Sequence, residues 1–503
     1  MAQHVSDQGD EHADDSLDPS DWDTFRQTAH DAIDRMIDHL KSLRDQPAWQ
    51  PMPKDIRQSF EQPVPTEGIG NEAALDSFFQ RVLPYSNGNQ HPRFWGFVQG
   101  TGLPLAALGD FLASMMNAHL AGFDQAPARV EEEVIRWLAE LIGFPSSSRG
   151  LLTSGGTMAG LLAMAVARHD RAGFDVREQG VLPSAKRPIR IYASTQTHHW
   201  LVKSVEALGL GRGCIHEIDV DDQYRLRVDV LARAIEQDIR EGKSPLAIVA
   251  NVGTVQTGAI DPLQAIAPLA RTHRLWLHID GAFGLLARLS PKLAPLLEGI
   301  EHADSVAFDL HKWMYIPFES ACVLIRQGDL AEKTFAWNTP YLARAARGVA
   351  AGGTPLADRG IELSRSFKAL KVWLILQSVG ARRLGEAIHQ NVLQAKELAL
   401  WIDEHPSLER MAPAPLNIVC FRFVAEGESD ERLDQVNEEI LYRVQESGLA
   451  VPSSTKLGKR YVLRVAIVNH RTRRSDLKLL IDAVVKHGET IIREGNSDGG
   501  KLS

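Results

Sequence analysis

Between residues 151 and 325, short apolar runs alternate with segments whose apolar residues recur every three or four positions. The short runs predict buried strands, and the periodic segments predict helices. We expect strands at 189–193, 246–252, 275–279, 305–308 and 321–325, and helices at 158–168, 200–208, 228–240 and 263–272. This alternation is typical of βαβ units, which predict an α/β fold with a mostly parallel sheet covered on both faces.

The N-terminal region has a different pattern. Residues 1–23 contain many acidic residues and no Lys or Arg, which predicts a disordered acidic tail over 1–20. Apolar residues then fall on one helix face over 22–43 and again over 72–82, with a proline-rich stretch between them. Two such helices cannot bury their apolar faces alone. We therefore expect 21–90 to pack on the main domain or on a second subunit.

The C-terminal part predicts a second, smaller domain. A helical pattern at 366–390 is followed by strand patterns at 418–423 and 461–468 and helical patterns at 431–447 and 475–492. We expect a large domain over 91–380 and a small α+β domain over 381–495. Residues 335–360 have no clear period and contain Gly348, Gly352 and Gly353, which predicts a mobile loop of the kind that closes active sites.

Composition narrows the functional classes. The chain has 503 residues, 44% of them hydrophobic, which is enough for two or more domains. A net charge of -9 argues against nucleic acid or an anionic membrane as partner. There is no membrane-length apolar run and no signal peptide, and three distant cysteines form neither a disulfide nor a zinc pattern. We expect a cytoplasmic protein without a metal site.

One lysine stands out in the segment 308–313, Phe-Asp-Leu-His-Lys-Trp. Apolar neighbours lower the pKa of a lysine and make its amine a nucleophile, but taken alone the segment favours a solvated Lys312 between two packing rings. Asp280 favours the nucleophilic Lys312 over the solvated one, because it ends another apolar run about thirty residues upstream. A lysine and an aspartate at strand ends are the smallest set of residues that binds pyridoxal phosphate. The lysine holds the aldehyde as a Schiff base and the carboxylate keeps the ring nitrogen protonated.

With these two residues, the sequence from about His91 to Arg473 resembles the group II pyridoxal-phosphate-dependent amino-acid decarboxylases, of which the aromatic-L-amino-acid decarboxylases are best known. The resemblance implies a fold type I enzyme that binds pyridoxal 5'-phosphate. It also implies a homodimer, in which the N-terminal helical segment wraps the partner chain.

Further motifs gain a role from this resemblance. The glycine pair before the helix at 158 could close on a phosphate, although it is weak evidence alone and is not a Walker A loop. The resemblance places the cofactor phosphate at Gly156 and Thr157. It places His198 flat on the cofactor ring, where the alternative is a histidine that caps a strand end. The other expected cofactor contacts are Thr254, Ala282 and His311.

The substrate side is less well determined. The resemblance places Phe97, Val98 and Gln99 in the pocket wall, with His119 or Leu120 from the other chain. Arg365 and Arg464 are both candidates for binding a carboxylate, and the sequence does not decide between them. In the resembled family, a tyrosine at the position of Tyr341 marks decarboxylases, whereas aldehyde synthases carry phenylalanine there. We therefore assign Tyr341 as the acid that protonates the product.

These residues predict the decarboxylation of an L-amino acid to its amine and carbon dioxide. An aromatic substrate is the first expectation, and glutamate, aspartate or 2,4-diaminobutyrate are alternatives. An aldehyde synthase or an aminotransferase on the same fold remains possible, and so does a catalytically silent cofactor-binding dimer. The retained Lys312, Asp280 and His198 argue against the silent dimer.

Overall fold

The computed structural model describes residues 16–181, 187–337, 346–352 and 355–499. The chain divides into two compact units. The N-terminal unit comprises Met1–Gln46 and Gln50–Ser86, and the main unit comprises Pro47–Trp49 and Asn87–Ser503. Within the described residues, none of the helices combines the length and the apolar character needed to span a bilayer.

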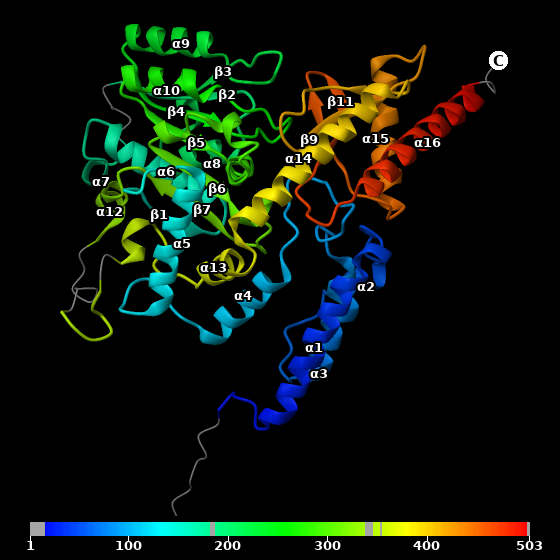
Figure 1. The fold of residues 1–503 in the computed structure, drawn as a ribbon, viewed down its shortest axis with the longest axis horizontal. Helices are drawn as coiled ribbons and strands as arrows, with labels where there is room; N and C mark the ends of the chain where they lie inside the picture. Colours follow the sequence, from blue (N-terminus) through cyan, green and yellow to red (C-terminus); the bar gives the residue numbers. More distant parts are fainter. Residues whose placement is uncertain (1–15, 182–186, 338–345, 353–354, 500–503) are drawn as a thin grey trace, which may run out of the picture. The chain divides into compact units, whose positions relative to one another are not determined.

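A seven-stranded sheet forms the centre of the large domain, with the strand order β1-β7-β6-β5-β4-β2-β3 (Figure 1). The strands are β1 (Arg149–Thr153), β2 (Ile189–Ser194), β3 (Ile215–Ile218), β4 (Ser244–Asn251), β5 (Trp276–Asp280), β6 (Ser305–Asp309) and β7 (Ala321–Ile325). Neighbouring strands from β3 to β6 are parallel, whereas β7 runs antiparallel to both β6 and β1. The predicted mostly parallel sheet is confirmed, and β1 and β3 are additional strands.

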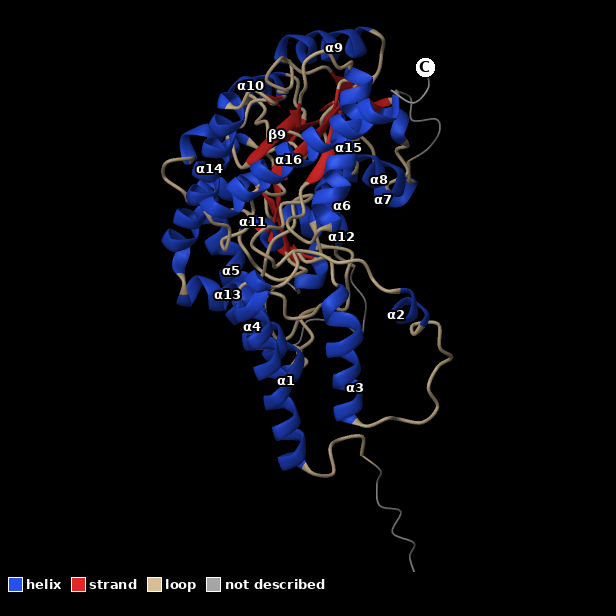
Figure 2. Cartoon of the chain, turned by 90° about the vertical axis from the view of Figure 1, so that its right-hand side faces the viewer, coloured by secondary structure: helices blue, strands red, loops and turns tan. Residues whose placement is uncertain are grey.

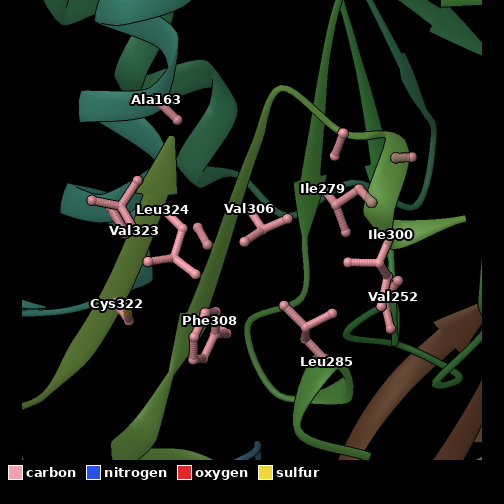
Figure 3. Packing of buried hydrophobic residues seen from close by; sticks show 14 of the residues in the cluster. Ala163, Val252, Ile279, Leu285, Ile300, Val306, Phe308, Cys322, Val323 and Leu324 are labelled. Carbon is pink, nitrogen blue, oxygen red and sulfur yellow. The ribbon is translucent and has the colours of Figure 1, made fainter. Parts of the chain in front are cut away.

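Helices flank this sheet, as Figure 2 shows for the chain coloured by secondary structure. They are α5 (Ala126–Ile142), α6 (Gly156–Arg171), α7 (Val176–Gln179), α8 (Trp200–Ala207), α9 (Val228–Arg240), α10 (Leu263–Thr272), α11 (Leu310–Trp313) and α12 (Asp329–Phe335). Helix α6 packs across β4 to β7, while α9 and α10 pack on β4. Figure 3 shows the resulting core, in which Ala163 of α6 faces the side chains of β6 and β7.

Two helices near residue 380 differ from the sequence prediction. A single helix was expected over 366–390, but the chain forms α13 (Ala369–Ser378) and then α14 (Gly380–Glu404). The break lies at Gly380, whose φ of 78° belongs to the left-handed region and cannot continue a right-handed helix. Helix α14 then connects the large domain to the small one (Figure 1). Helix α4 (Pro104–Met116), which precedes α5, was not predicted.

The small domain is built on a four-stranded antiparallel sheet with the order β10-β11-β9-β8. Its strands are β8 (Leu408–Arg410), β9 (Ile418–Phe423), β10 (Ser453–Leu457) and β11 (Arg460–Ala466), and its helices are α15 (Asp430–Glu446) and α16 (Arg474–Gly499). The predicted small α+β domain is therefore present. Its core includes Phe421, Val465 and Leu480, all fully buried.

The N-terminal unit contains α1 (Trp22–Ser42), α2 (Lys54–Gln58) and α3 (Asn71–Ser77), followed by a π-helical turn at Phe78–Val82. Both expected helices form, and α2 is additional. The guanidinium of Arg35 pairs with Asp76 at 2.7 Å and lies 3.8 Å from the centre of the Phe79 ring, so it joins α1 to the segment at α3. No residue of α1 is fully buried.

Candidate active site

The carboxyl ends of the parallel strands meet at one edge of the large sheet. In the strand register, Asn251 at the end of β4 pairs with Asp280 at the end of β5, and Asp280 pairs with Ala307 of β6. Residues that follow these strands must therefore converge, as is usual for ligand sites in open α/β sheets. A cavity of about 650 Å³ lies there, within the range of sites for small molecules.

The cavity brings together the predicted site residues that the structure describes. Its lining includes Phe97, Val98, Gln99, Gly156, Thr157, His198, Thr254, Asp280, Ala282, His311 and Lys312. These residues come from segments that are more than two hundred positions apart in the sequence. Their shared location agrees with a single site, and their individual roles remain predictions. Tyr341 lies outside the described residues.

Lys312 lies on the one-turn helix α11, which begins directly after β6. Its side chain is 24% exposed, and its Nζ lies 2.7 Å from Oδ2 of Asp309. Asp309 is buried, and its other oxygen, Oδ1, has no hydrogen-bond partner among the described residues. His311 Nε2 lies 3.8 Å from the paired oxygen. The amine is thus held in place by a carboxylate that the sequence analysis did not assign.

Asp280 is the second carboxylate of the cavity and is 8% exposed. Its Oδ1 accepts a hydrogen bond from the backbone N–H of Ala282 at 3.0 Å, and its Oδ2 accepts one from Trp200 Nε1 at 2.6 Å. Burial raises the pKa of this carboxyl, while the two hydrogen bonds and the nearby Lys312 and His198 act in the opposite direction.

Two histidines border the cavity. The Nδ1 of His198 accepts the backbone N–H of Trp200 at 3.2 Å, so the proton of the neutral ring sits on Nε2. Burial lowers the pKa of His198, and Asp280 opposes that shift. The ring of His311 stacks on Phe318 with a centroid distance of 4.4 Å, and burial lowers its pKa as well. Both imidazoles are therefore favoured in the neutral form.

The first turn of α6 lies at the cavity wall, where the sequence analysis expects the cofactor phosphate. Gly155 precedes this helix and offers no side chain to cap it, so the backbone N–H groups and the positive end of the helix dipole face the cavity. A Cβ added to Gly156 would lie 3.1 Å from each oxygen of Asp309, a tight contact that a larger residue could make only if the Asp309 carboxylate shifted. The hydroxyl of Thr157 adds a donor at the cavity wall.

Thr254 lines the cavity, but its hydroxyl already takes part in a turn. Its Oγ1 accepts the backbone N–H of Ala259 at 3.1 Å and lies 3.1 Å from the hydroxyl of Thr257. The side chain is buried. A hydrogen bond from Thr254 to a bound ring remains a prediction.

The side of the cavity assigned to substrate combines aromatic and polar groups. Phe97 is 60% exposed and has a φ of 61°, a strained conformation for a residue with a Cβ. Gln99 accepts a hydrogen bond from Asn87. Leu120 is fully buried in the core of its own chain, so it is not available to a partner's pocket, whereas His119 is exposed.

The two candidate arginines lie in different places. Arg365 does not line this cavity; its guanidinium pairs with buried Glu131 and donates to the carbonyl of Leu152 at 3.0 Å. Arg464 on β11 does line the cavity. Its Nε donates to the carbonyl of Gln256 at 3.1 Å, and its Nη1 donates to the carbonyl of Phe97.

Arg464 keeps one free donor. Its Nη2 is buried without a hydrogen-bond partner among the described residues, and burial lowers the pKa of its guanidinium to about 10. The group remains positively charged at neutral pH. A buried cation with an unused N–H donor favours an anion in the cavity, because leaving such a donor unpaired costs about 1–3 kcal/mol or more.

Sequence reasoning missed several residues of the cavity. Asp309, Trp200 and Phe318 line it together with Ser453 and Thr455 of the small domain. A signal existed for Asp309, because it lies three residues before Lys312, a spacing that brings two side chains to the same face of a helical turn. No local signal existed for Ser453 and Thr455, because the small domain reaches the cavity only in the folded chain.

Comparison with protein families gives one match over most of the chain. The model of the pyridoxal-dependent decarboxylase conserved domain matches residues 53–424. An aromatic-L-amino-acid decarboxylase from Bacillus atrophaeus is 34% identical over 454 residues, which are 89% of this chain and 92% of that protein. A phenylacetaldehyde synthase from Arabidopsis thaliana is 28% identical over 460 residues, covering 90% of this chain and 93% of that protein.

Solved structures give the same result for the fold. Oryza sativa TDC crystallised with PLP and tryptamine superposes with a TM-score of 0.87 at 26% identity, covering 95% of this chain and all of that one. Mouse CSAD superposes with a TM-score of 0.85 at 26% identity, covering 92% of this chain and 99% of that one. The predicted fold type I architecture is therefore confirmed.

Proposed function

This chain belongs to the pyridoxal-dependent decarboxylase family, and from that premise we propose that it removes the α-carboxyl group of an aromatic L-amino acid. It is a pyridoxal-phosphate-dependent amino-acid decarboxylase. The observation that carries the proposal is the single cavity that gathers Lys312, Asp280, His198 and Arg464. The proposal also covers the choice of substrate, the roles of individual residues and the assembly of the chain.

The residues of the cavity fit pyridoxal phosphate. The cofactor supplies an aldehyde that binds amines covalently and a protonated ring that takes up the electron pair left when carbon dioxide departs. The first turn of α6, at Gly156 and Thr157, would hold the phosphate, as uncapped helix N-termini do. Buried Asp280 would hold the ring nitrogen in its protonated form, and Lys312 would hold the aldehyde.

The remaining cavity residues would support the ring and order its surroundings. His198 would lie against the face of the ring, with its tautomer fixed by the backbone N–H of Trp200. Thr254 and Ala282 would lie along the ring's edge, as expected from the family resemblance. His311, stacked on Phe318 and 3.8 Å from the Asp309 oxygen that pairs with Lys312, would hold that carboxylate and the cavity wall in place.

Arg464 is the residue we assign to the substrate's α-carboxylate. Its Nη2 is buried and has no hydrogen-bond partner among the described residues, and no carboxylate is among the groups that act on its pKa. Arg365 is already committed to Glu131, which argues against it as the binding group. Binding the carboxylate through a fixed guanidinium would hold the bond to be broken in one orientation, which is how an enzyme of this cofactor selects its reaction.

The same arrangement favours a substrate with one carboxylate. The cations among the described lining residues are Lys312 and Arg464, and both have a task in the proposed reaction. No further cation in that lining would pair with the side-chain carboxylate of glutamate or aspartate. Phe97 and Phe318 line the cavity, are 60% and 53% exposed as whole residues, and would offer apolar surface to an aromatic side chain.

We rank two other activities of the same site below decarboxylation. An aldehyde synthase would couple decarboxylation to oxidation by dioxygen. The similarity to a phenylacetaldehyde synthase supports this alternative. An aminotransferase would use Lys312 to move a proton without loss of carbon dioxide. A decarboxylase of glutamate, aspartate or 2,4-diaminobutyrate is the remaining alternative. Tyr341 would supply the proton to Cα in a decarboxylase, an assignment that rests on the sequence resemblance.

Product analysis tests the proposal directly. The purified enzyme, loaded with pyridoxal phosphate, is incubated with each of the twenty amino acids and with 2,4-diaminobutyrate, and the products are separated by mass spectrometry. We expect tryptophan, tyrosine or phenylalanine to give the amine and carbon dioxide in equal amounts. Turnover confined to glutamate, aspartate or 2,4-diaminobutyrate would contradict the aromatic assignment. A keto acid product would contradict decarboxylation itself.

The assembly we propose is a homodimer. The support is an exposed apolar face on α4, formed by Leu108, Phe111, Leu112, Met115 and Met116, together with exposed apolar residues on α1. Contiguous apolar surface of this kind marks protein interfaces. A small-molecule amino acid is the only other partner proposed, and the cytoplasmic location stays a prediction.

A further inference from the structure

Trp200 contacts two groups of the cavity at once. It is the first residue of α8 and is 4% exposed. Its backbone N–H donates to Nδ1 of His198 at 3.2 Å, and its indole Nε1–H donates to Oδ2 of Asp280 at 2.6 Å. One residue therefore joins an imidazole on the loop before α8 to a carboxylate at the end of β5.

The indole can reach Asp280 because α6 leaves space for it. A Cβ added to Gly160 would lie 2.4 Å from two carbons of the Trp200 ring, so any larger residue there would displace the indole. On its other side the indole meets the ring of His278 edge to face, with a centroid distance of 5.4 Å. With these contacts in place, the indole N–H points at Asp280.

We propose that Trp200 is a positioning residue, which keeps Asp280 ionised and aligned with the cofactor's ring nitrogen while it fixes His198 on the face of the same ring. This inference rests on the proposed function, which assigns Asp280 and His198 to the cofactor. It adds a residue that touches neither the substrate nor the reacting atoms. The chemistry it serves is the recognition of a protonated pyridine ring.

The role of Trp200 can be measured through the charge state of Asp280. The titratable groups that face Asp280 are Lys312 on α11 and His198 on the loop before α8. Burial raises the carboxyl pKa, and the Trp200 hydrogen bond is the first of the contacts that lower it. Without that bond the pKa rises further, so Asp280 takes up a proton at a higher pH and stops attracting the ring's N–H.

The experiment measures binding without catalysis. Apoenzyme is dialysed to equilibrium against pyridoxine 5'-phosphate, which has the ring and the phosphate but no aldehyde, so the chemistry of Lys312 does not enter. Affinity is recorded from pH 5 to pH 9 for the wild type and for Trp200→Phe, which keeps an apolar ring but has no N–H. We expect the acid-side loss of affinity to move to higher pH by about one unit in the variant, the size expected for one hydrogen bond to a charged group.

A matched control exists in the same sheet. Trp276 on β5 is also buried, and its Nε1 donates to Ser305 Oγ at 2.7 Å, away from Asp280. Trp276→Phe removes an equivalent indole hydrogen bond, so we expect the same kind of loss in thermal stability but no shift of the pH profile. An equal shift in both variants would overturn the proposal, because it would reflect general loosening of the core.

A second variant perturbs the indole without replacing it. Gly160→Ala should push the Trp200 ring aside and shift the profile in the same direction as Trp200→Phe. Its result decides the question if Trp200→Phe does not fold. A wild-type profile in a folded Gly160→Ala protein whose indole has moved, as judged by tryptophan fluorescence, would also overturn the proposal.

Asp280→Asn separates this inference from the function on which it rests. If Asp280 is the ring's partner, Asp280→Asn should abolish the part of the acid-side transition that exceeds the titration of the ligand's phosphate, and adding Trp200→Phe to it should change nothing further. An unchanged transition in Asp280→Asn would refute the assignment of Asp280. A transition lost in Asp280→Asn but unmoved in Trp200→Phe would leave that assignment intact and refute the role of Trp200.

Discussion

Lys312 and Asp309 form an ion pair inside the cavity, between the one-turn helix α11 and the last residue of β6, which precedes that helix. Asp309 is nearly fully buried, so its carboxylate depends on Lys312 for compensation, and removing one member of a buried pair costs about 3–5 kcal/mol. That figure is an upper bound here, because Lys312 is 24% exposed and water screens part of its charge. The pair holds the amine at the carboxyl edge of β6 in a fixed orientation.

Lys312→Ala tests whether this amine is the one that binds the cofactor. Borohydride treatment of the wild type with pyridoxal phosphate should fix the cofactor to one peptide, which contains Lys312, and the variant should lack that adduct in a mass spectrum. Decarboxylation should fall by at least three orders of magnitude, about 4 kcal/mol in the barrier, since no other amine of the described cavity lining can release the product.

Lys203→Ala is the control for this prediction, because Lys203 is an exposed lysine on α8 that does not line the cavity. It should keep both the adduct and the wild-type rate. Decarboxylation by Lys312→Ala within tenfold of the wild type would remove Lys312 from its assigned role.

At the scale of elements, we expect the residue at position 341, in the segment after α12, to determine whether the product is an amine or an aldehyde. Helix α12 ends at Phe335, and Tyr341 follows within six residues. We expect Tyr341→Phe to stop clean amine formation. Without an acid to protonate Cα, the electron pair left by carbon dioxide becomes available to dioxygen, giving aldehyde, ammonia and hydrogen peroxide.

The measurement is a joint assay of amine and peroxide under air and under nitrogen. Peroxide and aldehyde should appear in equal amounts in the variant, and only when oxygen is present. Tyr85→Phe, which changes a tyrosine of the N-terminal unit, should behave as the wild type. If Tyr341→Phe still forms only the amine at the wild-type rate, Tyr341 is not the acid, and the sequence argument against an aldehyde synthase is lost.

Elements with a strong hydrophobic pattern were predictable from the sequence, and weakly patterned ones were not. Strands β4 to β7 are buried runs of apolar residues and were found close to their observed limits. Strand β3 was missed because Ile215–Ile218 is a four-residue edge strand with polar residues at its centre. Strand β1 was also missed. It contains Gly150, whose missing side chain lets the carbonyl of Val323 approach, because a Cβ there would lie 2.1 Å from that carbonyl oxygen.

The residues of the candidate site were likewise predictable only where the local sequence pattern marked them. Lys312, Asp280 and Gly156 could be found because each lies at the end of a recognisable strand or at the start of a helix. Trp200 and Arg464 could not be assigned, since their roles depend on contacts across 80 and 208 positions of sequence. Hydrogen-bond partners at such separations follow from the packing of whole elements, which local periodicity does not encode.

At the scale of the molecule, the two units differ in how much apolar surface they bury. The main unit has large continuous cores in both of its domains. The N-terminal unit has almost none, because α1, α2 and α3 contain no fully buried residue while Ile33, Ile37, Phe60 and Ile69 are exposed. Most helical stability in proteins comes from the packing of an apolar face, so we expect these helices to be stabilised by a surface outside the unit.

Truncation tests whether that surface belongs to a second copy of the chain. A protein that begins after Pro65 lacks α1 and α2, and we expect its dimer dissociation constant to rise at least tenfold, about 1.4 kcal/mol, since the exposed apolar faces of those helices no longer contribute. Size-exclusion chromatography with light scattering, over a dilution series, measures this. Removing residues 1–15 alone, which precede α1, should leave the dimer unchanged. Equal dimerisation and activity in the longer truncation would mean that the N-terminal helices serve their own chain, and the apolar face of α4 would then be the place to find the interface.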